Sequence, residues 1–235
     1  MNVLAIDTTH AFCSASVLSD ENGPFDVVHS ERHEIGRGHA EKLLHIIETT
    51  LQKAGVCREE IGRIVVNTGP GSFTGLRVGV AAARGLALAL KCDCVGVTAL
   101  EGLARECRVT TSKNDCDEIL VLINAGRGEV VCQIFDGDTR EARSSARTLS
   151  VEQARLEFSE FQGIAIGSGT QDCFGPPPGT ALSISPHCWP DIETIGRIGA
   201  EPTRTGPASP FYSRAADAKP QTSSNLVAKS DSDPK

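Results

Sequence analysis

The residues most suggestive of chemistry lie in a glycine-rich stretch, TGPGSFTG at 68–75, which leads into an apolar helical segment. A glycine-rich turn before a helix exposes backbone N–H groups and the positive end of the helix dipole, which together form a general anion site. The stretch is not a Walker A loop, because Leu76 and Arg77 follow Gly75 where that motif requires lysine. Phosphate binding at this turn would therefore lack its usual cation.

A second candidate group combines a carboxylate with another glycine turn. Asp7 ends the first predicted strand and is followed by Thr8, and Gly167 and Gly169 flank a turn after the predicted strand 164–166. A carboxylate in the position of Asp7 either sits beside a bound phosphate and its metal, or bonds to nearby N–H groups in a turn. Both interpretations remain open, and the four residues are the candidates for a vestigial nucleotide site.

Histidine and cysteine spacing predicts no metal site. His29 and His33 are spaced HxxxH, but HExxH is absent and no third ligand is evident. The nine cysteines include no CxxC pair, and the closest two, Cys92 and Cys94, fit one face of a strand. Because zinc needs about four ligands with recognisable spacing, we expect free cytosolic thiols. No Ser/His/Asp or Cys/His catalytic arrangement can be identified either.

The helix after the glycine loop carries small residues at every fourth position, namely Gly75, Gly79, Ala83 and Ala87. Glycine inside a helix costs roughly 1 kcal/mol relative to alanine, so the stripe indicates close approach of another backbone. That neighbour lies either within the same chain or in another subunit, and the spacing does not choose between them. A second small-residue stripe runs through Ala81, Gly85 and Ala89.

The elements that must position these residues predict an α/β fold of two lobes. The first lobe is predicted to contain strands at 3–6, 11–18, 25–29, 61–67 and 95–97, and helices at 39–54, 76–90 and 98–107. The second lobe is read as strands 119–123, 130–135 and 164–166, with helices at 150–158 and 191–200. Each lobe fits a βββαβα (ribonuclease-H-like) unit, with the second copy reduced.

The predicted boundaries are 1–107 for the first lobe and 118–215 for the second, separated by the polar stretch 108–117. Residues 216–235 are polar and predict a disordered tail that is dispensable for folding. The formal net charge of −7 opposes direct, tight binding of nucleic acid. The apolar run 78–90 contains Arg84 and is too short to span a bilayer, and no secretion signal is visible. We therefore expect a cytoplasmic protein with no membrane segment.

The stretch GPGSFTGLRVG at 69–79 resembles the signature of the TsaB family. Similar matches occur at LAIDTT (4–9), GHAEKLL (38–44), VGVTALEGLA (95–104), NAGRGEVV (124–131) and PFYSRAADAKPQ (210–221). The resemblance implies the ASKHA fold of actin, Hsp70 and sugar kinases. It also implies partnership with TsaD and TsaE, which complete bacterial synthesis of threonylcarbamoyladenosine on tRNA.

The resemblance also implies that catalysis lies elsewhere. In the catalytic paralogue TsaD, a similar helix is followed by two metal-binding histidines, and Ala99 and Leu103 occupy the matching positions here. Asn124 stands where the TsaB pattern D-A-R-x-G-E-V begins with an acid. The resemblance therefore implies no catalytic residue, metal or cofactor in this chain, with ATP and metal on the partner. It also counts against a peptidase activity.

These observations favour a non-catalytic scaffold subunit that binds TsaD, forms a homodimer when alone, and meets tRNA only through the complex. Two rivals are an ATP-using small-molecule kinase of the same superfold and a metallopeptidase, which an ATPase assay and elemental analysis would separate. We predict the partner surface on the helices that begin near His39 and Thr74. Its predicted contact residues are His39, Leu43, Ile47, Gly75, Leu76, Gly79, Ala83 and Ala87.

Overall fold

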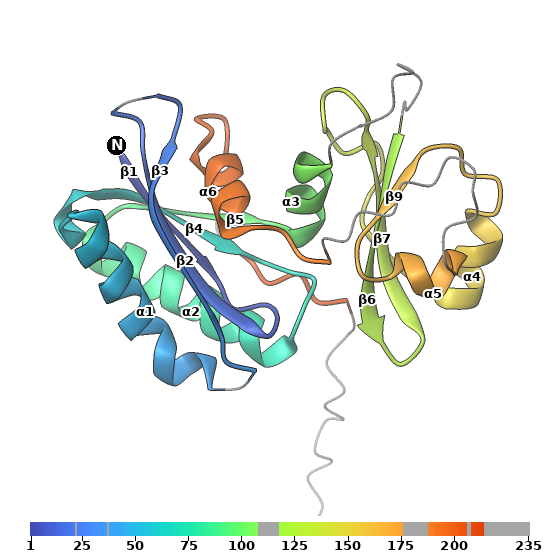
Figure 1. Cartoon of the computed structure of the whole chain (residues 1–235), viewed down its shortest axis with the longest axis horizontal. Coiled ribbons are helices and arrows are strands. Elements are labelled where there is room, and N and C mark those ends of the chain that lie inside the picture. The colour runs from blue at the N-terminus through green and yellow to red at the C-terminus, as the bar shows by residue number, and fades with distance from the viewer. Residues whose placement is uncertain (22, 37, 108–117, 176–187, 206–207, 214–235) are drawn as a thin grey trace, which may run out of the picture.

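The computed structural model describes residues 1–21, 23–36, 38–107, 118–175, 188–205 and 208–213, which form two lobes (Figure 1). The first lobe is built on a five-stranded sheet in the order β3–β2–β1–β4–β5. Its strands are β1 (Asn2–Asp7), β2 (Phe12–Ser19), β3 (Asp26–Glu34), β4 (Ile61–Asn67) and β5 (Asp93–Val97). The helices of this part of the chain are α1 (His39–Ala54), η1 (Arg58–Glu60), α2 (Phe73–Leu90) and α3 (Ala99–Glu106).

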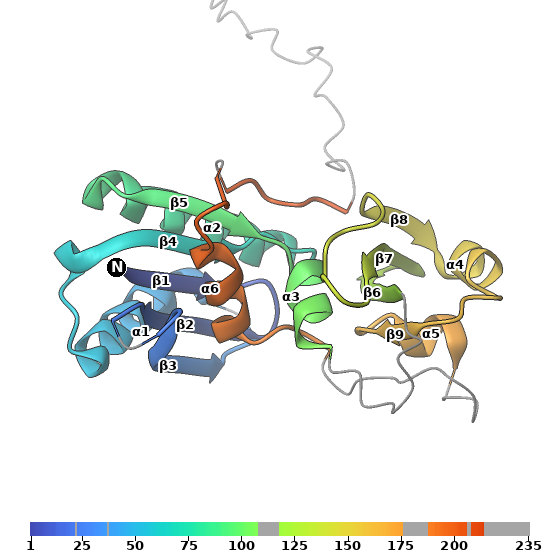
Figure 2. The same ribbon diagram turned by 90° about the horizontal axis from the view of Figure 1, so that it is seen from above.

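Strand β1 lies at the centre of the first sheet and is buried on both faces. Leu4 and Ile6 point into a core shared with α1 and α2. Val3 and Ala5 point into a second core on the opposite face, shared with α6 (Ile192–Ala200). Successive side chains of a strand alternate between faces, so an unbroken apolar run is typical of a strand covered on both sides. Helices accordingly lie on both faces of this sheet, with α6 in front of it and α1 and α2 behind it in Figure 2.

The second lobe repeats the first unit in a smaller form. Its four-stranded sheet has the order β8–β7–β6–β9, with β6 and β7 antiparallel and β6 and β9 parallel. Its elements are β6 (Glu118–Gly126), β7 (Glu129–Asp136), β8 (Arg147–Ser150), α4 (Val151–Glu157), β9 (Ile164–Ile166) and α5 (Thr170–Phe174). Both lobes therefore follow the order βββαβα, which confirms the predicted duplicated unit and its reduced second copy.

Two helices pack against the sheet of the lobe to which they do not belong by sequence order. Helix α3 belongs by sequence to the first unit but packs against the face of β6, β7 and β9. Helix α6 follows the second unit but returns to the first sheet, where Ile192, Ile195 and Ile198 are buried beside Val3 and Val65. The predicted range of the second lobe, 118–215, is therefore wrong at its C-terminal end, because the apolar face of α6 covers the first sheet. The predicted boundary 108–117 and tail 216–235 lie outside the described residues.

Several elements are longer than their sequence patterns predict. Strand β3 continues to Glu34, and α2 begins at Phe73 with Ser72 as its N-cap. Strand β8 and helix α5 were not predicted. In the part of the chain that the structure describes, α2 is the one helix that is long and apolar enough by composition to cross a membrane. Its buried residues pack on the first sheet, and a core helix passes the same test.

Candidate functional site

A cavity of about 600 Å³ lies where the two lobes face each other. The first lobe contributes the turn after β1 and the glycine-rich loop, including His10 and Ser72, and the second lobe contributes Asn124 and Ala125. Trp189, which precedes α6, forms a further wall. The volume suits a small molecule. None of the described residues that line it is an aspartate, glutamate, lysine or arginine, so these residues supply no charged side chain of those types to bind a metal or a polyphosphate.

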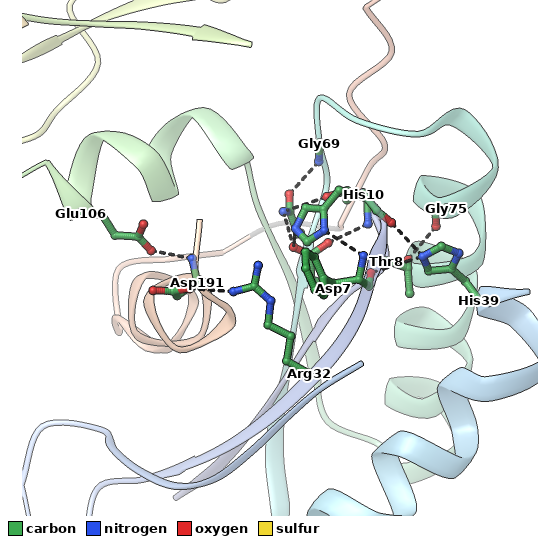
Figure 3. A network of polar contacts seen from close by, with 12 residues as sticks. Asp7, Thr8, His10, Arg32, His39, Gly69, Gly75, Glu106 and Asp191 are labelled. Atoms are coloured by element: carbon green, nitrogen blue, oxygen red, sulfur yellow. Dashed lines mark hydrogen bonds and ion pairs between the residues drawn. The ribbon is translucent and has the colours of Figure 1, made fainter. Parts of the chain in front are cut away.

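Asp7 holds the turn after β1 together and does not line this cavity. Its carboxylate accepts hydrogen bonds from the Thr9 N–H at 2.7 Å and the Asn67 amide at 2.9 Å, and His10 Nε2 lies 3.2 Å away (Figure 3). Burial opposes ionisation, but the bond and charge of His10, with the Thr9 and Asn67 bonds, outweigh it and lower the pKa of Asp7. The turn interpretation of Asp7 is therefore the one that fits the structure.

The glycine-rich loop is occupied by the protein's own backbone. The Ser72 N–H donates to the Thr9 carbonyl at 2.6 Å, and the Thr8 hydroxyl donates to the Gly75 carbonyl at 2.7 Å. A Cβ at Gly71 would collide with the Thr9 carbonyl, and one at Gly75 with the Thr8 carbonyl. The glycines thus allow the β1–β2 turn to lie directly on the start of α2. This contact engages the Ser72 N–H, while other residues of the loop line the cavity between the lobes.

The glycine turn of the second lobe is closed in the same way. The Gly169 N–H donates to the Leu122 carbonyl at 2.9 Å, and a Cβ at Gly167 would collide with that same carbonyl. Neither glycine lines the cavity between the lobes, and the same holds for Asp7 and Thr8. None of the four residues of the predicted vestigial nucleotide site therefore lies in the wall of this cavity, and that site stays a prediction.

The two positions aligned with metal-binding histidines are both apolar and buried. Ala99 and Leu103 lie in the core between α3 and the second sheet. Among the described residues, no three His, Cys, Asp or Glu side chains are arranged to hold a metal ion. His29 and His33 instead place their Nε2 atoms 2.9 and 3.0 Å from the carboxylate of Glu31.

The predicted contact residues on α1 and α2 face inward. Leu43, Ile47, Leu76, Ala83 and Ala87 are at most 5% exposed. Four of these, all but Leu76, belong to the core under the first sheet. The stripe therefore packs within the chain. The prediction that these residues form a partner surface is wrong, because their side chains are buried.

The remaining predicted contact residues also make their contacts inside the first lobe. The imidazole of His39 lies with Nε2 2.8 Å from the His10 carbonyl, and a Cβ at Gly79 would collide with the Thr8 hydroxyl. Gly75 carries the close contact with the Thr8 carbonyl described above. The two glycines of the stripe are therefore explained by the β1–β2 turn that lies against them, and Ala83 and Ala87 by the core under the sheet.

The opposite side of α2 is apolar and exposed. Leu88 is 82% exposed and Phe73 45%, and a Cβ at Gly85 would meet no atom within 4 Å. On neighbouring α1, Leu44 is 55% exposed. The outer face of α2 consists of its exposed residues Phe73, Thr74, Arg77, Ala81, Arg84, Gly85, Leu88 and Ala89.

Comparison with known proteins identifies the family. The family model of TsaD, tRNA N6-adenosine threonylcarbamoyltransferase, matches residues 29–170. The tRNA threonylcarbamoyladenosine biosynthesis protein TsaB of Escherichia coli is 27% identical over 176 residues, which cover 73% of each protein. This chain is a TsaB-type member of the TsaD family. The TsaB of Buchnera aphidicola is 31% identical over 128 residues, covering 54% of this chain and 57% of that protein.

A solved structure agrees with the TsaB-type fold. A Pseudomonas aeruginosa protein described as similar to the peptidase YeaZ superposes with a TM-score of 0.71 at 25% identity. The superposition covers 91% of this chain and 99% of that one. Both lobes, and the helices between them, therefore belong to the two-lobed ASKHA architecture that the sequence predicted.

Some residues that shape this TsaB-type site carry no clear sequence signal. The rings of His10 and Trp189 are in contact, 5.1 Å apart between centroids and tilted by 43°, although they lie far apart in the chain. Arg63 of β4 donates to the carbonyls of Gly199 and Glu201, so it caps the end of α6. Only the position of Trp189 just before a predicted helix could have drawn attention to it.

Proposed function

We propose that this chain is a non-catalytic subunit that supports the transfer of threonylcarbamoyl to an adenosine of tRNA by a TsaD-type enzyme. The observation that carries the proposal is that the chain's own carbonyls, those of Thr9 and Leu122, each accept an N–H of one glycine turn. An enzyme that transfers groups from ATP needs open phosphate loops and bound metal to stabilise charge. The apolar side chains of Ala99 and Leu103 support the same conclusion, as do the described residues that line the cavity, none of which is aspartate, glutamate, lysine or arginine.

The partner surface that we propose is the outer face of α2 together with the exposed Leu44 of α1. Its chemistry suits a protein partner, because aromatic, arginine and exposed apolar side chains dominate the energetics of protein interfaces. Ala81 and Gly85 leave the middle of the face smooth, so a helix of the partner can approach closely. Leu88 then supplies a large apolar anchor at one end.

The other end of this face carries an arginine held in place by aromatic rings. The Arg77 guanidinium lies 3.7 Å from the centre of the Phe73 ring and 5.9 Å from that of Tyr212. The rings of Phe73 and Tyr212 are themselves 5.4 Å apart. An arginine oriented in this way loses less freedom when it binds a carboxylate. We therefore expect an acidic residue of the partner opposite Arg77.

The alternative of an ATP-using small-molecule kinase has less support. Such an enzyme needs phosphate loops in both lobes and a free catalytic aspartate, but the Asp7 carboxylate is engaged by Thr9, Asn67 and His10. We expect the subunit to act in the cytoplasm beside TsaD and TsaE, to reach tRNA only through the assembled complex, and to self-associate through the same face when TsaD is absent.

The test is binding to the TsaD-type protein of the same organism. We expect co-purification and a measurable dissociation constant for the pair, with negligible ATP hydrolysis by this chain alone. Turnover by the isolated chain at ordinary enzyme rates, about 1 s⁻¹ or more, would favour the kinase alternative. A Leu88→Asp variant that remains folded and binds as tightly as the wild type would refute the proposed surface.

A further inference from the structure

Residues Ala208–Ser213, which we call the strap, cross from the first lobe to the second. In Figure 2 the strap runs from the side of β5 towards β8. At its start, Ala208 is fully buried in the core under the first sheet and lies against Gly96 of β5. The Phe211 N–H then donates to the Thr68 carbonyl at 2.8 Å. These two contacts fix the strap to the first lobe.

The end of the strap is held by the second lobe. The Thr148 hydroxyl of β8 donates to the Ser213 carbonyl at 2.9 Å, and the Phe211 ring packs against the core between α3 and the second sheet. Strand β8 has four residues and lies at the edge of its sheet. Short edge elements open locally at little cost in free energy. The bond from Thr148 therefore ties an easily opened strand to the strap.

Between these anchors the strap follows the exposed side of α2. The Arg84 guanidinium donates to the Ser209 hydroxyl oxygen at 3.3 Å. About two helical turns earlier, the Tyr212 ring lies 5.4 Å from the ring of Phe73 and 5.9 Å from the Arg77 guanidinium. Tyr212 is 45% exposed, so its ring extends the outer face of α2. The strap thus borders the proposed partner surface.

We propose that Tyr212 is part of the partner surface and that the strap couples this surface to the second lobe. A partner that covers Tyr212 and Phe73 holds the strap against α2, and the strap in turn holds β8 through Thr148. Because Ser213 also lines the cavity between the lobes, partner binding and the shape of that cavity are linked. The inference rests on the proposed function, since the occupant is the TsaD-type partner proposed there.

The size of each effect follows from the contacts involved. Tyrosine and arginine are enriched among the residues that dominate binding energy, and truncation of such a tyrosine typically weakens binding about tenfold or more. A single hydrogen bond such as that between Thr148 and Ser213 changes an opening equilibrium by roughly 2- to 10-fold. This second figure limits what the strap transmits to β8.

The experiment is hydrogen exchange of β8 in the full chain, with and without a saturating amount of the TsaD-type partner. We expect the partner to slow exchange in Arg147–Ser150 by roughly 2- to 10-fold in the wild type. Thr148→Val removes the donor and keeps the shape of the side chain, so it should bind the partner and lose the slowing. Thr148→Ser is the matched control, because it keeps the hydroxyl and should keep the slowing.

The outcomes separate the strap from the proposed function. Partner binding without any slowing at β8 in the wild type would overturn the strap and leave the proposed function intact. An equal slowing in Thr148→Val would do the same, because it would show that the partner protects β8 by another route. If the partner does not bind the wild-type chain at all, the proposed function fails and the coupling fails with it.

A second variant tests the strap from the side of α2 and covers the case in which Thr148→Val does not fold. Tyr212→Ala should weaken partner binding about tenfold or more and reduce the slowing at β8 when the partner is saturating. Tyr212→Phe keeps the ring and should match the wild type in both measurements. Circular dichroism confirms that each variant is folded. Wild-type affinity or wild-type slowing in a folded Tyr212→Ala chain would overturn the proposal.

Discussion

Two substitutions on α2, two residues apart, should have opposite effects on folding and on partner binding. Ala83 is fully buried under the first sheet, whereas a Cβ at Gly85 meets open space. Leucine at 83 must fit into a filled core, and leucine at 85 projects from the outer face of α2. The pair therefore separates the inward stripe from the proposed partner surface.

The magnitudes follow from these positions. Overpacking a core typically costs about 1–3 kcal/mol, so Ala83→Leu should lower the melting temperature by roughly 2–10 °C in a chain of this length. Replacing an exposed helical glycine by leucine gains about 0.8 kcal/mol of helix propensity, so Gly85→Leu should raise it by roughly 2–3 °C. In the complex, the same leucine forces a closely packed helix away and should weaken binding about tenfold or more.

Thermal unfolding followed by circular dichroism gives the first quantity, and isothermal titration with the TsaD-type partner gives the second. Gly85→Ala serves as the control, because it gains helix propensity while adding only a methyl group to the surface. The reasoning would be refuted if Gly85→Leu bound as tightly as the wild type. It would also be refuted if Ala83→Leu weakened binding without lowering the stability of the free chain.

Three further predictions concern the closed turns and the absent chemistry. Gly75→Ala should destabilise the free chain by about 2 kcal/mol or more, because its methyl group would collide with the Thr8 carbonyl, and the melting temperature measures this loss. The lowered pKa of Asp7 means that its carboxylate stabilises the fold above the ordinary pKa of 3.8, and that this contribution disappears as the pH falls further. The Asp7→Asn variant has no such carboxylate, so its stability should fall less steeply than that of the wild type below about pH 4. Elemental analysis of the purified chain should find no stoichiometric zinc or iron, and metal that survives dialysis would contradict the alignment of Ala99 and Leu103.

The sequence predicted the elements best where local chemistry defines their ends. Gly55 ends α1 in a left-handed conformation, and the pairs Thr98 with Glu101 and Ser150 with Gln153 form the predicted capping boxes. These signals act within a few residues of the helix end and do not depend on the rest of the fold. The order of elements in the first unit was predicted in full, whereas the second unit was predicted without β8 and α5.

The elements that were missed depend on tertiary contacts. Strand β8 spans four residues, Arg147–Ser150, and exists through its pairing with β7. The end of β3 is rich in charged residues because it forms the edge of the sheet, so its pattern resembles a loop. Helix α6 is amphipathic, but its sequence does not say which of the two sheets it will cover.

The candidate surface was placed on the wrong side of the correct helix. Helix α2 carries small or apolar residues around most of its circumference, so periodicity could not separate the inner stripe from the outer face. The glycines of the inner stripe, Gly75 and Gly79, are explained by contacts with Thr8, which lies more than 60 residues earlier in the chain. No local pattern reports such a long-range contact.

The most direct test of the central claim is the rate of threonylcarbamoyl transfer to tRNA by the TsaD-type partner, measured with its other components while this chain is titrated in. The account predicts little transfer without this chain, a rise that saturates near one copy per TsaD, and no transfer by this chain alone. Full activity of the partner in the absence of this chain, or transfer by this chain without TsaD, would contradict it.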